Sequence, residues 1–171
     1  MRALYLTGFA IIGLTGCSGG GMTDVEPNGP VVTAADFTLV EGDGWSGNLT
    51  YLDYGSEKRV TIPATASVDV ISSTTLKYSI SYPKEPWEDT KAKIKLSQSG
   101  RVLDGHVVMS RETRPDGSVA LTTLHQGEDN NQPAEIRLTY VLSASKFVIE
   151  KDVRFEASAE FMNRNIYRFL R

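Results

Sequence analysis

The sequence contains no complete motif for nucleophilic catalysis. Residues 44–47 read GWSG and begin like the nucleophile elbow Gly-x-Ser-x-Gly, but that motif needs glycine at position 48, where Asn48 stands. The stretch also lies where a first β-strand is expected, rather than a strand-to-helix turn. We therefore predict that the protein is not an enzyme. A hydrolase or other enzyme that uses carboxylates on a barrel rim is the alternative, because paired carboxylates leave no motif in a sequence.

The two histidines of the chain, His106 and His125, lie on neighbouring predicted strands joined by the turn sequence RPDGS. A two-residue turn at Asp116 and Gly117 would place both side chains on one face of the sheet. A type I turn followed by a bulge at Gly117 would place them on opposite faces, and Pro115 favours this second form. The sequence therefore predicts two separate histidines on the surface or lining a cavity, with no metal and no other cofactor.

Two acidic clusters have side chains that could bind a cation. One contains Glu85, Glu88 and Asp89, and the other contains Glu128 and Asp129 within the stretch GEDNNQ. The second cluster lacks the glycine and the distal glutamate of an EF-hand loop. It is interpreted as a turn, and no metal site is predicted there.

Two basic residues lie among apolar ones on predicted strands, and both are candidate ligand-binding residues. Lys151 and Arg164 each alternate with apolar residues on the same face, namely Phe147, Ile149 and Val153 for the first and Met162 and Ile166 for the second. If these faces point inward, each charge must pair inside the protein, for example with Asp53, or meet a ligand carboxylate. Internal pairing is the favoured interpretation.

Three aromatic residues are further candidates for contact with a ligand or a partner. Trp87 lies in SYPKEPWEDTK, the longest irregular connection, where Pro83 and Pro86 stiffen the chain. A rigid loop that presents an aromatic residue is typical of a partner-binding site or a lid over a barrel mouth. The favoured interpretation is nevertheless that Trp87 folds back to cap the core. Tyr78 and Tyr140 lie on the inward faces of their predicted strands.

Short runs of alternating polar and apolar residues, broken by turn residues, predict an all-β domain. The clearest are residues 75–82 and 135–142, in which every second residue is apolar. Further strands are expected at 45–53, 59–71, 92–96, 105–114, 119–126, 146–154 and 161–170. Short connections between strands favour an antiparallel up-and-down barrel of about 8–10 strands, with a β-sandwich as the alternative. The polar outward positions exclude strands that span a membrane.

This predicted barrel is similar in outline to the calycin group, which comprises lipocalins, fatty-acid-binding proteins and nitrobindin-like barrels. The resemblance rests on EGDGWSGNLTY, which leads to Trp45, and on NRNIYRFLR, which supplies Arg164, Arg168 and Arg171. Asp43 stands where the lipocalin Gly-x-Trp motif has glycine. The resemblance implies that Trp45 lies on the first strand, near a basic residue late in the last strand.

The N-terminus predicts export and lipid attachment. Arg2 precedes an apolar run at residues 3–14 that is too short to span a bilayer, as in a secretory signal peptide. The following LTGC resembles the bacterial lipobox, which implies cleavage after Gly16 and attachment of a diacylglyceryl group to Cys17, with acylation such as palmitate on the new amine. Cys17 is the only cysteine, so an internal disulfide is excluded.

These features divide the chain into a signal peptide at residues 1–16, a flexible tether at 17–36 and one barrel domain at 37–171. Ser18 after the lipidated cysteine implies, by resemblance to enterobacterial lipoproteins, transport to the outer membrane with the domain facing the periplasm. The net charge of −3, without a basic cluster, argues against nucleic acid as a partner and against a polybasic patch for anionic lipid.

The sequence therefore predicts a lipid-anchored envelope protein whose barrel binds something. The expected ligand is a small apolar or amphipathic molecule, or else an envelope protein partner. A structural accessory of assembly, with a filled barrel and no pocket, is a further alternative.

Overall fold

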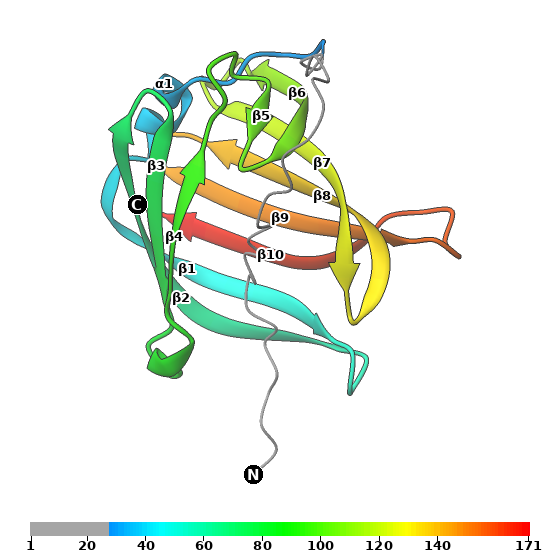
Figure 1. The fold of residues 1–171 in the computed structure, drawn as a ribbon. Coiled ribbons are helices and arrows are strands. Elements are labelled where there is room, and N and C mark those ends of the chain that lie inside the picture. Colours follow the sequence, from blue (N-terminus) through cyan, green and yellow to red (C-terminus); the bar gives the residue numbers. More distant parts are fainter. Residues whose placement is uncertain (1–27) are drawn as a thin grey trace, which may run out of the picture.

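Ten antiparallel strands form a nearly closed barrel in the computed structural model, which describes residues 28–171 (Figure 1). The predicted signal peptide, the lipobox with Cys17 and the first part of the predicted tether lie outside the described residues. The strands are β1 (Gly42–Asp53), β2 (Lys58–Ser72), β3 (Thr75–Ser81), β4 (Thr90–Lys95), β5 (Val102–Leu103), β6 (His106–Thr113), β7 (Val119–Asp129), β8 (Gln132–Leu142), β9 (Lys146–Phe155) and β10 (Met162–Leu170). A one-turn helix α1 (Ala34–Phe37) and two 3-10 turns, η1 (Thr38–Val40) and η2 (Pro86–Glu88), complete the fold.

The strands follow one another around the barrel in chain order, and β1 pairs with β10 to join the two ends of the meander. The predicted up-and-down barrel is confirmed, and the β-sandwich does not form. All nine expected strands are present. The sequence analysis missed β5, because a strand of two residues is too short to show an alternating pattern.

The ring of strands is weakest between β4 and β6. Leu96 and Leu103 form an isolated bridge there, and β5 contributes only two residues to the pairing. Within residues 28–171 no strand pairs with the outer edge of β4 beyond this bridge. We call this interruption of backbone pairing between β4 and β6 the seam (Figure 1).

Trp45 anchors the start of β1 in the core. Its side chain is 1% exposed, and its indole N–H donates a hydrogen bond to the carbonyl of Val40 at 2.8 Å. The guanidinium of Arg171, the residue after β10, lies 4.3 Å from the centre of the Trp45 ring. A basic residue that follows the last strand therefore covers Trp45.

The short helix α1 closes one end of the barrel. The backbone N–H of Thr33 donates to the Asp36 carboxylate at 2.9 Å, and Arg111 of β6 donates two hydrogen bonds to the same group. Burial alone would raise the pKa of Asp36, but the hydrogen bonds from Arg111 and Thr33 hold it below its ordinary value. The carboxylate can thus be buried at the helix because its charge is paired.

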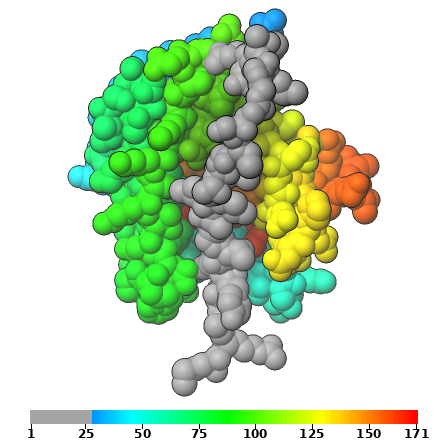
Figure 2. Space-filling view, in the orientation of Figure 1, coloured from blue at the N-terminus to red at the C-terminus, as the bar shows by residue number. Residues whose placement is uncertain are grey.

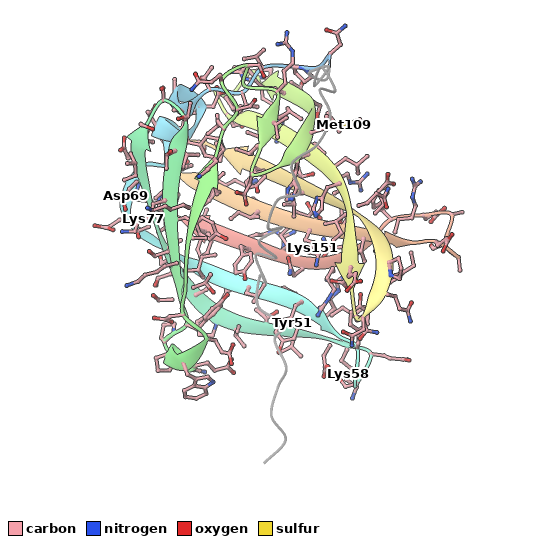
Figure 3. The ribbon with its side chains drawn as sticks, in the orientation of Figure 1. Tyr51, Lys58, Asp69, Lys77, Met109 and Lys151 are labelled. Atoms are coloured by element: carbon pink, nitrogen blue, oxygen red, sulfur yellow. The ribbon has the colours of Figure 1, made fainter. Side chains whose placement is uncertain are left out.

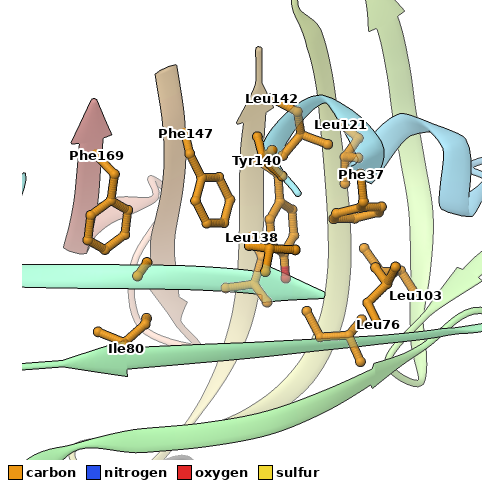
Figure 4. Close-up of a cluster of buried hydrophobic side chains, with 14 of the residues drawn as sticks. Phe37, Leu76, Ile80, Leu103, Leu121, Leu138, Tyr140, Leu142, Phe147 and Phe169 are labelled. Carbon is orange, nitrogen blue, oxygen red and sulfur yellow. The ribbon is translucent and has the colours of Figure 1, made fainter. Parts of the chain in front are cut away.

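Phe37 of α1 fills this end of the barrel. Its ring packs edge-on against Tyr140 with 6.3 Å between the ring centres, among the side chains of Leu76, Leu103 and Leu121 (Figure 4). The void that remains beside Phe37 and Tyr140 measures about 10 Å³, no more than one water molecule needs. The interior at the α1 end is therefore a packed core.

Residues just before the predicted domain boundary at residue 37 pack against the barrel. Val32 is 1% exposed, and its backbone N–H donates to the carbonyl of Gly100 at 2.9 Å. Asp36 and Phe37 are buried as well. The composition of this stretch is typical of a linker, and a few buried residues without a regular period leave no pattern that a sequence analysis can detect.

Candidate functional site

A charged cluster lies inside the barrel, on the side away from α1. Asp129 accepts hydrogen bonds from Lys151 Nζ at 2.6 Å and from the Tyr54 hydroxyl at 2.5 Å, and Arg164 Nε lies 3.4 Å from its Oδ2 atom. Arg164 also donates to the carbonyl of Leu52, and its guanidinium lies 4.5 Å from the centre of the Tyr54 ring. We call Asp129, Lys151, Arg164 and Tyr54 the Asp129 cluster. They come from β7, β9, β10 and the turn after β1.

The β7–β8 hairpin positions Asp129 at the end of β7. Asn130 and Asn131 have φ angles of 50° and 57°, the left-handed values of a two-residue type I′ turn, and Asp129 pairs with Gln132 across it. Because side chains alternate along a strand, Asp129 points to the same side as the inward residues of β7, which include Leu121, Thr123 and His125. Figure 3 shows Lys151 on β9 in the middle of the barrel.

The Asp129 cluster carries one net positive charge. Lys151 and Arg164 supply two cations against the single carboxylate, and Tyr54 stays neutral because burial and its hydrogen bond to Asp129 raise its pKa. The side chains of Lys151 and Arg164 are 19% and 17% exposed. Within the described residues Lys151 donates one hydrogen bond, which leaves two of its three N–H donors for another acceptor. The cluster therefore favours an anionic partner.

The sequence predicts internal pairing of Lys151 and Arg164, and the structure confirms it, but with Asp129 in the place of Asp53. Asp53 instead accepts hydrogen bonds from Ser56 and from the Gly55 N–H, and these, together with the nearby charge of Arg164, lower the pKa of its carboxyl. Sequence reasoning missed Asp129 because it assigned the acidic stretch to a turn. Every second residue of β7 points inward, and extending this alternation to the last residue of the strand would have identified Asp129 as an inward residue.

The two histidines stack face to face inside the barrel. The rings of His106 and His125 are 3.5 Å apart and nearly parallel, at 3°. The predicted bulged turn forms, with Gly117 at a φ of 79°. A second irregularity between Val108 and Ser110 then moves the register by one residue, so that Val107 faces Leu124 and His106 comes opposite His125. The prediction that they lie on opposite faces is therefore wrong.

Both imidazoles are held in the neutral form. Burial, the neighbouring His106 and the charge of Lys151 lower the pKa of His125 to about 4. Burial also lowers the pKa of His106, against the opposing effect of Asp104. A neutral pair can stack at this distance, whereas two imidazolium rings would repel each other.

Two inward polar atoms of β7 lack a hydrogen-bond partner within the described residues. They are Oγ1 of Thr123, which is 0% exposed, and Nδ1 of His125. A buried polar atom without a partner costs free energy, and a bound water or a polar ligand group is the usual partner in such a position. Thr123 and Lys151 both flank Leu138 of β8 in register, so these atoms lie on the wall that carries the Asp129 cluster.

The structure does not bring the remaining candidates to this cluster. Tyr140 is buried against Phe37, and Tyr78 lines the same small void, where burial raises its pKa to about 12. Trp87 is 75% exposed, so the expectation that it folds back to cap the core is wrong. The residues before it explain this, because Tyr82 of the same connection is buried in its place, with its hydroxyl 2.8 Å from that of Tyr167.

The described residues contain no group of three or more His, Cys, Asp or Glu side chains placed to hold a metal ion. Within residues 28–171 no helix is long and apolar enough to cross a membrane. The sequence matches no known family model, and no curated protein is significantly similar to it.

Proposed function

We propose that this protein is a lipid-anchored envelope lipoprotein whose barrel binds a small amphipathic molecule with an acidic head group. The observation that carries the proposal is the Asp129 cluster inside the barrel, where two cations contact one carboxylate and leave one positive charge among the four groups. An acidic group that accepts the free donors of Lys151 would balance this charge. The inward residues beside Lys151, Ile149 and Leu138, would contact the apolar part of the same molecule.

One further feature supports a binding role for this half of the barrel. The unpartnered Thr123 hydroxyl and the unpartnered nitrogen of His125 are polar groups that a ligand could satisfy.

The ligand proposal is tested with a dansylated fatty acid and its methyl ester, which differ only in the acidic group. We expect the acid to bind about tenfold more tightly than the ester, because it can form a charge-assisted hydrogen bond with Lys151. Lys151→Met should abolish this difference, whereas Lys58→Met, at the exposed first residue of β2, should retain it. Equal binding of acid and ester to the wild-type protein would refute the assigned role of the cluster.

Native mass spectrometry of protein extracted from its own envelope tests the same proposal without a chosen probe. We expect a retained small molecule whose mass is lost on unfolding. If the protein carries no such molecule and also fails to bind the dansylated acid, the result favours the alternative of a structural assembly accessory with a filled barrel.

The lipid anchor is tested independently by Cys17→Ser. This variant should fail to incorporate labelled palmitate and should remain uncleaved by the lipoprotein signal peptidase. Unchanged palmitate incorporation would contradict the assignment of Cys17. Fractionation of inner and outer membranes then tests the outer-membrane location that Ser18 implies.

A second candidate function, binding of an envelope protein partner, is favoured by the exposure of Trp87. Exposed tryptophan on a proline-stiffened loop is a common anchor in protein interfaces. A photo-crosslinking amino acid at position 87 should give one discrete adduct in living cells, and the same probe at exposed Glu57 should not. No adduct at position 87 would remove this candidate.

A further inference from the structure

Four lysines project from the outer face of the sheet beside the seam. In β4, Lys91, Lys93 and Lys95 are exposed and alternate with the inward Ala92 and Ile94. Lys77 of β3 stands directly opposite Lys93 and is partly exposed, with its side chain near that of Asp69 of β2 (Figure 3). We call Lys77, Lys91, Lys93 and Lys95 the lysine face, which belongs to the green side of the molecule in Figure 2.

The lysine face carries an excess of positive charge on a chain whose net charge is −3. Lys77 makes one long contact with Asp69, at 3.7 Å between exposed groups. In the part of the chain that the structure describes, Lys91, Lys93 and Lys95 form no ion pair. The positive charge is therefore segregated onto one surface rather than cancelled.

This arrangement does not serve the stability of the fold. Two like charges directly opposite each other on paired strands, as Lys77 and Lys93 are, destabilise a sheet. Lysines on an edge strand do hinder the addition of another strand, which accounts for those of β4. Edge protection does not account for Lys77, because β3 is paired on both sides.

We propose that the lysine face is a docking surface for the phosphate head groups of an anionic membrane. Alternate residues of a strand are roughly 7 Å apart, so Lys91, Lys93 and Lys95 span about 14 Å in a straight row. A row of this length matches many phosphates at a surface better than one small anion. Each lysine near an anionic membrane strengthens partition about fivefold.

The proposal commits to a membrane because it rests on the proposed lipid anchor at Cys17. The chain between Cys17 and the buried Val32 can extend at most about 50 Å, so the anchor keeps the whole barrel close to the bilayer. Anchorage alone leaves the orientation of the barrel free. Docking of the lysine face sets this orientation and turns β4, one edge of the seam, toward the membrane. That is the side from which an amphipathic ligand of the bilayer would arrive.

The test uses the full lipidated protein in vesicles of phosphatidylcholine, with and without phosphatidylglycerol. Lysines are labelled with an amine-reactive acetyl reagent, and the modification of each lysine is measured by mass spectrometry. Lys58 and Lys146 are exposed on other parts of the barrel and serve as internal controls. We expect phosphatidylglycerol to reduce the labelling of Lys91, Lys93 and Lys95 at least fivefold relative to these controls, and high salt to restore it.

The test distinguishes failure of the lipid anchor from failure of the docking surface. Protein that does not stay with either kind of vesicle would contradict the lipid anchor. Protein that stays with both, but shows the same labelling of the lysine face and the controls, would overturn the docking surface and leave edge protection as its role. The triple variant Lys91→Gln, Lys93→Gln, Lys95→Gln should still associate through its anchor, and Lys77 should lose its protection by phosphatidylglycerol.

Discussion

Two buried carboxylates lie toward opposite ends of the barrel interior, and their surroundings differ. Asp36, in α1, meets one cation, Arg111, and also accepts a hydrogen bond from the backbone N–H of Thr33. Asp129, at the far end of β7, meets the two cations Lys151 and Arg164 and a phenol. The first group is balanced in charge, and the second has one positive charge in excess.

This difference separates the residues that hold the fold from those available for binding. The balanced Asp36–Arg111 pair fixes a helix whose Phe37 fills one end of the barrel, so that end has no room for a ligand. The unbalanced Asp129 cluster lies beside unpartnered polar atoms in the other half. The packed α1 end stabilises the scaffold. At the other end, the positive charge in excess can bind an acidic group of a ligand.

Removal of Phe37 should have the largest effect on stability. Phe37→Ala leaves a cavity that the surrounding strands cannot refill, and we expect a loss of about 3–5 kcal/mol in the free energy of unfolding, measured by urea denaturation. Ile71→Ala, at an exposed apolar residue of β2, should change it by less than about 0.5 kcal/mol. If the two variants were equally stable, the α1 end would not be the core of the domain.

The two carboxylates should respond unequally to neutralisation. Asp129→Asn leaves two largely buried cations without their carboxylate partner, and we expect the free energy of unfolding to fall by about 2–4 kcal/mol. Asp36→Asn should cost less, about 1–2 kcal/mol, because Arg111 is 30% exposed and can turn to solvent. Urea unfolding of both variants tests this order, with Glu128→Gln, at the exposed neighbour of Asp129, as the control. A larger effect at Asp36 would reverse the comparison.

Acid should destabilise the protein through the stacked histidines. The unfolded His125 takes up a proton near pH 6.5, but the folded one only near its pKa of about 4, so stability falls as the pH drops between these values. The loss should be about 1–2 kcal/mol after allowance for partial exposure of the ring. Urea unfolding between about pH 7 and pH 4 measures it.

His125→Gln provides the control for this pH dependence. The variant should show a shallower decline over the same range, since it lacks the imidazole whose pKa differs between the folded and unfolded states. Parallel curves for the wild type and the variant would contradict the assignment of the effect to His125.

Trp87 should contribute least to stability. Its side chain is 75% exposed, so Trp87→Ala should change the free energy of unfolding by less than about 0.5 kcal/mol. Thermal unfolding followed by circular dichroism measures this. A substantial destabilisation would mean that Trp87 packs on the barrel and is not free to contact a partner.

Much of the fold was predictable because it depends on local alternation. The strand at residues 75–82 was identified from its period of two, and the pairing of β7 with β8 follows from their inward residues. The candidate site was predictable only in part. The apolar neighbours of Lys151 and Arg164 indicated their inward direction, but nothing local indicated that Asp129 would reach both.

The histidines show where local reasoning fails. The turn at Pro115 was interpreted correctly, yet a single extra residue at Met109 moved His106 to the face of His125. A one-residue change of register transfers a side chain to the other face of a sheet, and such bulges carry no clear sequence pattern. The lysine face also contradicts the expectation of no basic cluster: Lys91, Lys93 and Lys95 alternate within one stretch of the sequence, and strand pairing adds Lys77 to them.

By itself, the sequence determined that the chain forms short amphipathic strands with polar turns, and hence an antiparallel all-β domain. Only the tertiary structure decided that α1 fills one end, that the ring is interrupted at the seam and that one carboxylate binds two cations. These features depend on contacts between residues far apart in the chain, such as Asp129 and Tyr54. Alternation is a property of neighbours along a strand, whereas charge balance is a property of neighbours in space.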